Sequence, residues 1–238
     1  MSIPLATIVP WGRTADEYER MFLLGAEDYS RQILDCGGGP ASFAAEWNAL
    51  GRRVTAVDPL YSLTGPEIRS RFDAAADSIL GAVRADPSRW GWSYHSSPDA
   101  LRDRRRQALE RFLADFDAGR TAQRYQTASL PSLPFPDDAF DLVLCSHLLF
   151  LYTEQLDAEF HRRATVELLR LAPEVRLFPL LTLAGTPSPH VETVLKTARE
   201  LGARAERVKV PYELQPGGNE MLRLVRRPVP QPPHEYQS

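Results

Sequence analysis

The chain has 238 residues, a formal net charge of −3, and 43% hydrophobic and 25% charged residues. This composition is typical of a soluble globular domain that buries a core without a structural metal or disulfides. Only two cysteines occur, Cys36 and Cys145, which excludes disulfide-scaffold and zinc-finger proteins. No apolar run approaches the roughly 20 residues that span a bilayer. The amino terminus lacks signal-peptide features, so we expect a cytoplasmic protein.

The first half of the chain predicts a βαβ unit. Helical spacing over 14–25 is followed by a short apolar run over 32–36, which ends in three glycines, Gly37 to Gly39. Helical spacing returns over 41–50, and a β-branched run over 54–58 ends in an acid. A strand, a glycine turn, a helix and a second strand form a crossover that makes the two strands parallel.

Residues 64–120 form a stretch longer than a simple α/β repeat needs. Two amphipathic helices are expected there, over 66–85 and 98–119, each with proline at its first position. The loop between them is rich in aromatic residues, from Trp90 to His95. We expect this helical insertion to be a lid that faces the substrate. Alternatively, its aromatic residues hold the helices to the core or form a dimer contact.

The remaining segments predict the rest of one sheet. We expect strands over 124–130, 139–146 and 174–183, helices over 153–171 and 188–201, and a closing hairpin formed by 205–213 and 220–227. Residues 1–227 would then form a single domain, while the proline-rich tail 228–238 is expected to be disordered. Oligomeric state cannot be predicted from these patterns.

A ligand site is predicted around the glycine turn. Glycines after a strand let a ligand approach the backbone, and the following helix points free N–H groups towards it. Asp58 lies 21 residues after Gly37, at the end of the next strand, where a carboxylate can accept hydrogen bonds from ribose hydroxyls. Asp35 either contacts the ligand or anchors the turn.

These residues resemble the class I S-adenosylmethionine-dependent methyltransferases. The resemblance rests on Asp35-Cys-Gly-Gly-Gly, on Asp58, and on segment 133–146, Leu-Pro-Phe-Pro-Asp-Asp-Ala-Phe-Asp-Leu-Val-Leu-Cys-Ser. It implies an α/β fold with a Rossmann-like, seven-stranded, mostly parallel sheet, helices on both faces and a closing antiparallel hairpin. Two departures are Ala41, where the family's loop has a third glycine, and Ser129, where an acid often holds the adenine.

The resemblance also implies a cofactor and its site. S-adenosylmethionine would be held by Asp35, Cys36, Gly37, Gly38, Gly39, Asp58, Pro59, Ser129, Leu130 and Ser146. Three shorter motifs are similar to a bacterial subgroup of the family: Trp11-Gly-Arg, Gly39-Pro-Ala-Ser-Phe and Ser146-His-Leu-Leu-Phe-Leu-Tyr.

His147 is the candidate catalytic residue. A histidine at the end of the fourth strand could take a proton from an attacking hydroxyl or amine, or it could be a buried core histidine. We expect a small-molecule methyl acceptor, with no metal, nucleic acid or membrane involved. An NAD-dependent oxidoreductase and a non-catalytic cofactor-binding module are the alternatives. Against NAD, Ser42 occupies the last position of the dinucleotide fingerprint, where glycine or alanine is usual.

Overall fold

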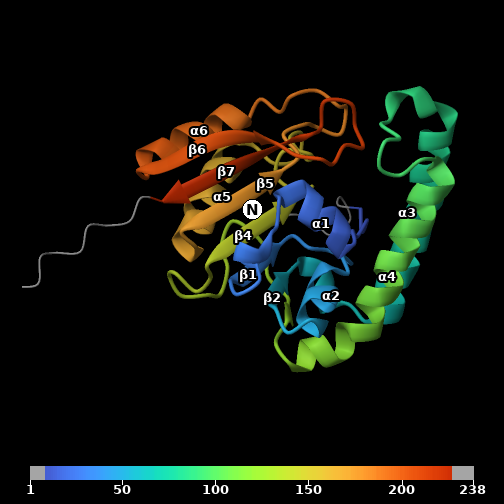
Figure 1. The fold of residues 1–238 in the computed structure, drawn as a ribbon, viewed down its shortest axis with the longest axis horizontal. Coiled ribbons are helices and arrows are strands. Elements are labelled where there is room, and N and C mark those ends of the chain that lie inside the picture. Colours follow the sequence, from blue (N-terminus) through green and yellow to red (C-terminus); the bar gives the residue numbers. More distant parts are fainter. Residues whose placement is uncertain (1–8, 227–238) are drawn as a thin grey trace, which may run out of the picture.

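A seven-stranded sheet forms the centre of the computed structural model, which describes residues 9–226 (Figure 1). Its strands lie in the order β3-β2-β1-β4-β5-β7-β6. Strands β1 to β5 are parallel, and β7 pairs antiparallel with both β5 and β6. The strands are β1 (Gln32–Cys36), β2 (Arg53–Val57), β3 (Tyr125–Gln126), β4 (Leu142–Ser146), β5 (Glu174–Phe178), β6 (Ala203–Lys209) and β7 (Glu220–Arg226). The predicted fold class is confirmed.

Helices cover both faces of this sheet, because side chains alternate along each strand. In β1, Leu34 and Cys36 pack on the side of α5 and α6, whereas Ile33 packs on the side of α1 and α2. The helices are α1 (Ala15–Phe22), α2 (Phe43–Ala49), α3 (Gly65–Ala85), α4 (Pro98–Thr121), α5 (Ala158–Leu171) and α6 (Val191–Glu200). Short 3-10 turns are η1 (Ala26–Asp28), η2 (Pro59–Ser62) and η3 (Pro87–Arg89).

The inserted segment between β2 and β3 is the helical hairpin of α3 and α4, which stands beside the sheet in Figure 1. Each helix begins at a capped position. The Thr64 N–H donates to Glu67 Oε2 at 2.8 Å, and Ser97 Oγ accepts from the Ala100 N–H at 3.1 Å. Helix α4 packs against both α3 and α2. The insertion is therefore attached to the βαβ unit through α4.

Three of the expected elements are each five residues shorter in the structure. Strand β3 has only two residues, because the chain leaves β2 after Gln126 and runs through a turn bridged by Ser129 and Ser132. Helix α5 begins at Ala158, where the Asp157 carboxylate caps it by accepting from the Phe160 N–H at 2.7 Å. Strand β5 ends at Phe178, since the following Pro179 cannot donate a ladder hydrogen bond.

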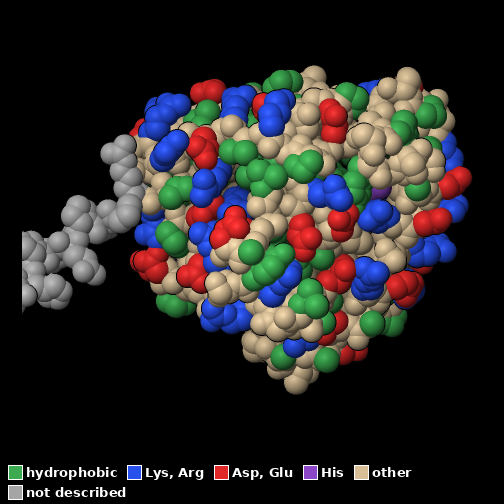
Figure 2. Space-filling view, in the orientation of Figure 1, with side chains coloured by type: hydrophobic (Ala, Val, Ile, Leu, Met, Phe, Trp, Pro, Cys, Tyr) green, Lys and Arg blue, Asp and Glu red, His purple; other side chains and the backbone are tan. Residues whose placement is uncertain are grey.

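Acidic and basic side chains are interspersed over the face of the molecule shown in Figure 2. No helix within residues 9–226 is long and apolar enough to cross a membrane. The proline-rich tail, expected over 228–238, lies outside the residues that the structure describes.

Candidate functional site

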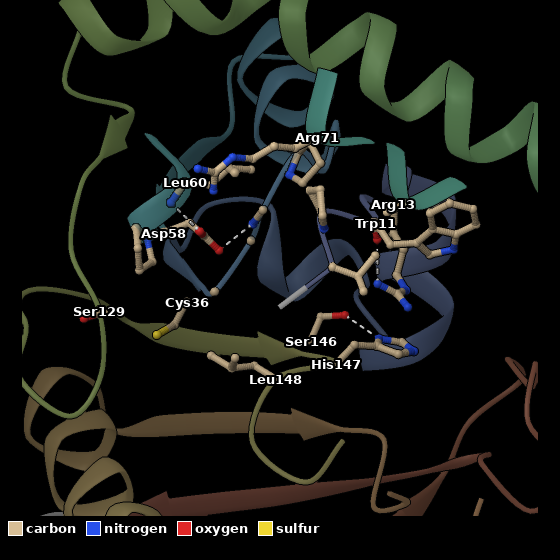
Figure 3. A pocket seen from close by; sticks show the side chains of 18 of the residues that line it. Trp11, Arg13, Cys36, Asp58, Leu60, Arg71, Ser129, Ser146, His147 and Leu148 are labelled. Atoms are coloured by element: carbon tan, nitrogen blue, oxygen red, sulfur yellow. Dashed lines mark hydrogen bonds between the residues drawn. The ribbon is translucent and has the colours of Figure 1, made fainter. Parts of the chain in front are cut away.

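A cavity of about 500 Å³ opens at the carboxyl ends of the parallel strands (Figure 3). It lies where β1 and β4 are neighbours and the strand order reverses, which is where open α/β sheets bind ligands. Its walls come from the ends of β1, β2 and β4, the stretch before α1, the turn after β3, and α3. The size is within the usual range for small-molecule sites, roughly 300 to 1,000 Å³.

The glycine turn after β1 forms the floor of this cavity. Gly37 and Gly39 have φ angles of +73° and +53°, which favour glycine. A Cβ on Gly37 would lie 2.5 Å from Leu148 Cδ2, so a larger residue would displace the Leu148 side chain. The turn closes with a hydrogen bond from the Ala41 N–H to the Gly38 carbonyl at 3.3 Å. Ala41 has no positive φ angle, so alanine in place of a third glycine is accommodated.

Asp58 follows β2 and lines the cavity. Its Oδ2 accepts from the Gly39 N–H at 3.0 Å, and its Oδ1 accepts from the Leu60 N–H at 2.7 Å. Burial raises the pKa of this carboxyl to about 6, and the two backbone hydrogen bonds oppose that rise. Each carboxylate oxygen keeps a second lone pair for a ligand. Asp58 therefore ties the glycine turn to β2 and still presents acceptors to the cavity.

Asp35 does not line the cavity, unlike the other expected cofactor residues. In β1 it points to the face of α1, where both carboxylate oxygens accept from the Tyr18 hydroxyl at 3.1 Å. Its Oδ2 lies behind the glycine turn, 2.5 Å from where a Cβ on Gly38 would be. Burial raises its pKa to about 7, against the lowering effect of Tyr18. Of the two roles expected for Asp35, this geometry favours a position behind the turn over direct contact with a ligand.

The remaining expected residues all reach the cavity: Cys36, Gly37, Gly38, Gly39, Pro59, Ser129, Leu130 and Ser146. Ser129 and Leu130 do so from the turn after β3, not from a strand. The structure adds Arg71, Ala74 and Ala75 of α3, so the insertion forms part of the wall. Helical periodicity alone could not have shown which side of α3 faces the site.

His147 lies at the cavity wall, directly after β4. Its φ angle is +52°, a left-handed conformation that is uncommon outside glycine and often found at functional sites. Nδ1 lies 2.8 Å from Ser146 Oγ, and the ring packs edge-on against Phe178. Burial, followed by the charges of Arg13 and Arg105, holds the pKa of His147 well below its ordinary value. The imidazole is therefore neutral at physiological pH.

Arg13 is a site residue that the sequence patterns did not single out. Its Nη1 donates to the Trp11 carbonyl at 2.9 Å, and its Nε is buried without a hydrogen-bond partner among residues 9–226. Burial and the neighbouring Arg105 lower its pKa. Figure 3 shows Arg13 beside His147 and across the cavity from Asp58. A guanidinium with a free donor here is suited to an anionic group.

The position of Arg13 follows from contact between two short motifs. Gly12 lies against the glycine turn so closely that a Cβ would be 2.0 Å from the Pro40 carbonyl oxygen. The Ser42 N–H donates to the Arg13 carbonyl at 3.0 Å. In the sequence, only the tripeptide Trp11-Gly-Arg itself could have indicated that Arg13 belongs to the site. Its contacts with Pro40 and Ser42 form only in the folded chain.

A second cavity, of about 180 Å³, adjoins the first. The two share Val9, Trp11, Arg13 and His147. From the aromatic loop of the insertion, Trp90 lines this second cavity, whereas the Trp92 indole N–H donates to the Pro87 carbonyl at 2.8 Å. Tyr94 and His95 pack against Tyr212. Trp90 of this loop therefore forms part of the cavity wall, whereas Trp92, Tyr94 and His95 make contacts within the protein.

Within residues 9–226 no group of three or more His, Cys, Asp or Glu side chains could hold a metal ion. The two cysteines, Cys36 and Cys145, are buried free thiols.

Solved structures give distant likenesses. Magnesium protoporphyrin IX methyltransferase from Synechocystis PCC 6803, with bound SAM, aligns with a TM-score of 0.46 and 14% identity over 89% of this chain and 90% of that chain. The PH0226 protein from Pyrococcus horikoshii gives 0.47 and 11%, over 89% of each chain. The glycopeptide N-methyltransferase MtfA gives 0.47 and 12%, over 94% and 96%. At such scores these likenesses carry no information on ligand or activity.

No protein-family model matches the chain. A curated relative, the uncharacterized protein MJ0045 of Methanocaldococcus jannaschii, is 35% identical over 217 residues, which are 91% of this chain and 95% of the relative. This relative is archaeal, so the expected restriction to a bacterial subgroup is not supported. Because the identity extends over nearly the full length of both proteins, the chain belongs to the same family as MJ0045.

Proposed function

We propose that this protein binds S-adenosylmethionine in the larger cavity and transfers its methyl group to a small-molecule acceptor. The observation that carries the proposal is the pair of opposed charges across the cavity, the Asp58 carboxylate at one end and the Arg13 guanidinium at the other. S-adenosylmethionine has matching groups at its two ends, a ribose with two hydroxyls and an amino acid with a carboxylate. The glycine turn lies between them.

Asp58 would hold the ribose. Each of its oxygens already accepts a hydrogen bond from one backbone N–H, which fixes the carboxylate. Because Asp58 lines the cavity, the remaining lone pairs would accept from the ribose hydroxyls. Arg13 would hold the carboxylate of the methionine moiety, since it lines the cavity and, among the described residues, its guanidinium donates only from Nη1 to the Trp11 carbonyl. Such charge-assisted hydrogen bonds are about twice as strong as neutral ones. Ala128 and Leu130 offer an apolar surface to the adenine, with Ser129 beside them.

His147 would act as the proton acceptor. When bound, the cofactor would supply an electrophilic methyl group, with its sulfur as the leaving atom. His147 Nε2 takes the proton of the attacking hydroxyl or amine as that atom forms its bond to the methyl carbon. This requires Nδ1 to carry the proton and donate to Ser146 Oγ, whose own hydroxyl can donate to Met21 Sδ at 3.9 Å. The lowered pKa keeps the imidazole neutral and able to accept.

Titration calorimetry with S-adenosylhomocysteine, S-adenosylmethionine and NAD tests the binding step. We expect both sulfur compounds to bind and to raise the melting temperature, because a ligand specific for the native state stabilises it. Binding of NAD without binding of either sulfur compound would contradict the proposal. Mass spectrometry of a metabolite extract incubated with the protein and S-adenosylmethionine then tests catalysis. A non-catalytic binding module would give cofactor binding and no methylated product.

A further inference from the structure

The second cavity meets the first at four shared residues, which include His147, the proton acceptor of the proposed function. It lies between the inserted hairpin and the segments that follow β4, β5 and β6. Its lining is mainly apolar and includes Ile79, Trp90, Leu101, Leu151, Phe178 and Leu183. A molecule held there would thus have one end at the shared boundary and the rest among apolar side chains.

The polar side chains in this wall are already engaged within the protein. The Tyr212 hydroxyl donates to Glu17 Oε1 at 3.0 Å and accepts from Arg105 Nη2 at 3.3 Å. The Tyr152 hydroxyl accepts from the Val9 N–H at 3.1 Å. The Gln215 side-chain amide donates to the carbonyls of Thr182 and Leu183. An occupant therefore finds few free polar partners away from the boundary.

Arg13 is the only charged side chain lining both cavities, as far as residues 9–226 are concerned. If it binds the cofactor carboxylate, as the proposed function requires, its charge is neutralised and is not available to a second anion. A charged occupant would then be desolvated in an apolar cavity without a counter-ion, which is strongly unfavourable. This favours an uncharged occupant.

The volume of the second cavity limits the size of the molecule that it can hold. An apolar cavity of about 150 Å³ binds benzene. At about 180 Å³, the second cavity accommodates a single substituted ring.

We propose that the second cavity is the acceptor site, and that the acceptor is an uncharged small molecule whose apolar part is about the size of one aromatic ring. This inference rests on the proposed function. The acceptor carries a hydroxyl, amine or thiol that faces His147. Its lone pair forms the new bond to the methyl carbon, the carbon–sulfur bond breaks with its electrons left on sulfur, and the acceptor's proton passes to His147.

Fluorine NMR with 4-fluorophenol, in the presence of S-adenosylhomocysteine, tests this inference. Leu183→Trp is a useful blocking variant, because Leu183 lines the cavity but is 57% exposed, so the larger side chain need not disturb the core. Leu201→Trp is the matched control, since Leu201 is 45% exposed and does not line the cavity. We expect 4-fluorophenol to bind, and Leu183→Trp to weaken it at least about tenfold. Leu201→Trp should have no effect.

The charged analogue 4-fluorobenzoate completes the experiment. We expect it to bind at least about tenfold more weakly than 4-fluorophenol. Three outcomes would overturn the inference. They are binding of 4-fluorobenzoate as tight as or tighter than that of 4-fluorophenol, no binding of 4-fluorophenol, and an equal loss of 4-fluorophenol affinity in both tryptophan variants. If S-adenosylhomocysteine binds and 4-fluorophenol does not, only the acceptor site is wrong. If S-adenosylhomocysteine fails to bind, the proposed function itself is wrong, and the acceptor assignment falls with it.

Discussion

Arg105 and Glu17 form an ion pair in which neither side chain is exposed to solvent. Arg105 Nη1 lies 2.7 Å from Glu17 Oε1 and 2.8 Å from Oε2. Arg105 belongs to α4 of the insertion and Glu17 to α1, whose first turn the same carboxylate caps by accepting from the Thr14 N–H. Tyr212, from the segment after β6, donates to Glu17 as well. The pair therefore joins the insertion, the segment carrying Arg13 and the end of the sheet.

Breaking this pair should destabilise the fold. Arg105→Met leaves the Glu17 carboxylate buried without its arginine partner, and such changes cost about 3 to 5 kcal/mol. Arg102→Met is the control, because Arg102 lies on the same helix, is 41% exposed and pairs with exposed Asp99 and Asp103. Its cost should be about 0 to 1 kcal/mol. Urea denaturation measures both values, and similar costs would show that the buried pair has no special role.

Asp35 should make stability depend on pH. Its native pKa is about 7, whereas an unfolded aspartate titrates near about 3.9. Between these two pH values the native state keeps a proton that the unfolded state releases. The contribution of Asp35 to the free energy of unfolding is therefore fully present below about pH 4 and is lost as pH rises through about 7. The loss is at most about 4 kcal/mol. Asp35→Asn should remove this part of the decrease in the free energy of unfolding, measured at about pH 5 and about pH 8. An unchanged slope would contradict the buried position.

Replacing Asp58 should weaken cofactor binding. Asp58→Ala removes the hydrogen bonds proposed for the ribose, which are worth about 1.5 to 3 kcal/mol when one partner is charged. Calorimetry with S-adenosylhomocysteine measures the change, after circular dichroism has confirmed that the variant is folded. Asp103→Ala serves as a control, because its side chain is 68% exposed on α4. Unchanged affinity for Asp58→Ala would mean that the ribose lies elsewhere.

Arg13 can be tested with two ligands, of which only one carries an amino acid group. S-adenosylhomocysteine carries an amino acid carboxylate, and 5′-methylthioadenosine lacks it. Arg13→Met should weaken the first by about 1.5 to 3 kcal/mol and leave the second nearly unchanged, since only the first has an anion for the guanidinium. Equal effects on both ligands would show that Arg13 does not hold the carboxylate.

His147 requires a substitution that preserves its backbone. Asparagine tolerates the left-handed conformation, so His147→Asn removes the proton acceptor without adding strain at φ +52°. With an identified acceptor, kcat should fall by about 10² to 10⁴, while S-adenosylhomocysteine affinity is retained. Because the pKa of His147 is well below its ordinary value, the wild-type rate should show no inflection near pH 6.5 and should fall only in more acidic solution. Unchanged kcat would exclude a role as base.

Much of the architecture could be predicted from the sequence, because it depends on local patterns. The alternation of strand and helix periods predicts the βαβ unit, and the apolar strands, the hairpin and the long insertion follow in the same way. The position of Asp58 at the cavity follows too, since strands joined by right-handed crossovers have their carboxyl ends at one edge. These properties depend on residues that are close in the chain.

Only the tertiary structure decided which side chains face the cavities. Whether Asp35 points to the ligand or to Tyr18 depends on which face of β1 is covered by α1. Arg13 reaches the site because Gly12 packs on Pro40, a contact between segments that are distant in sequence. The second cavity exists only because the insertion packs beside the segments after β4, β5 and β6. Such contacts arise from the packing of whole elements, whose relative orientation no local periodicity specifies.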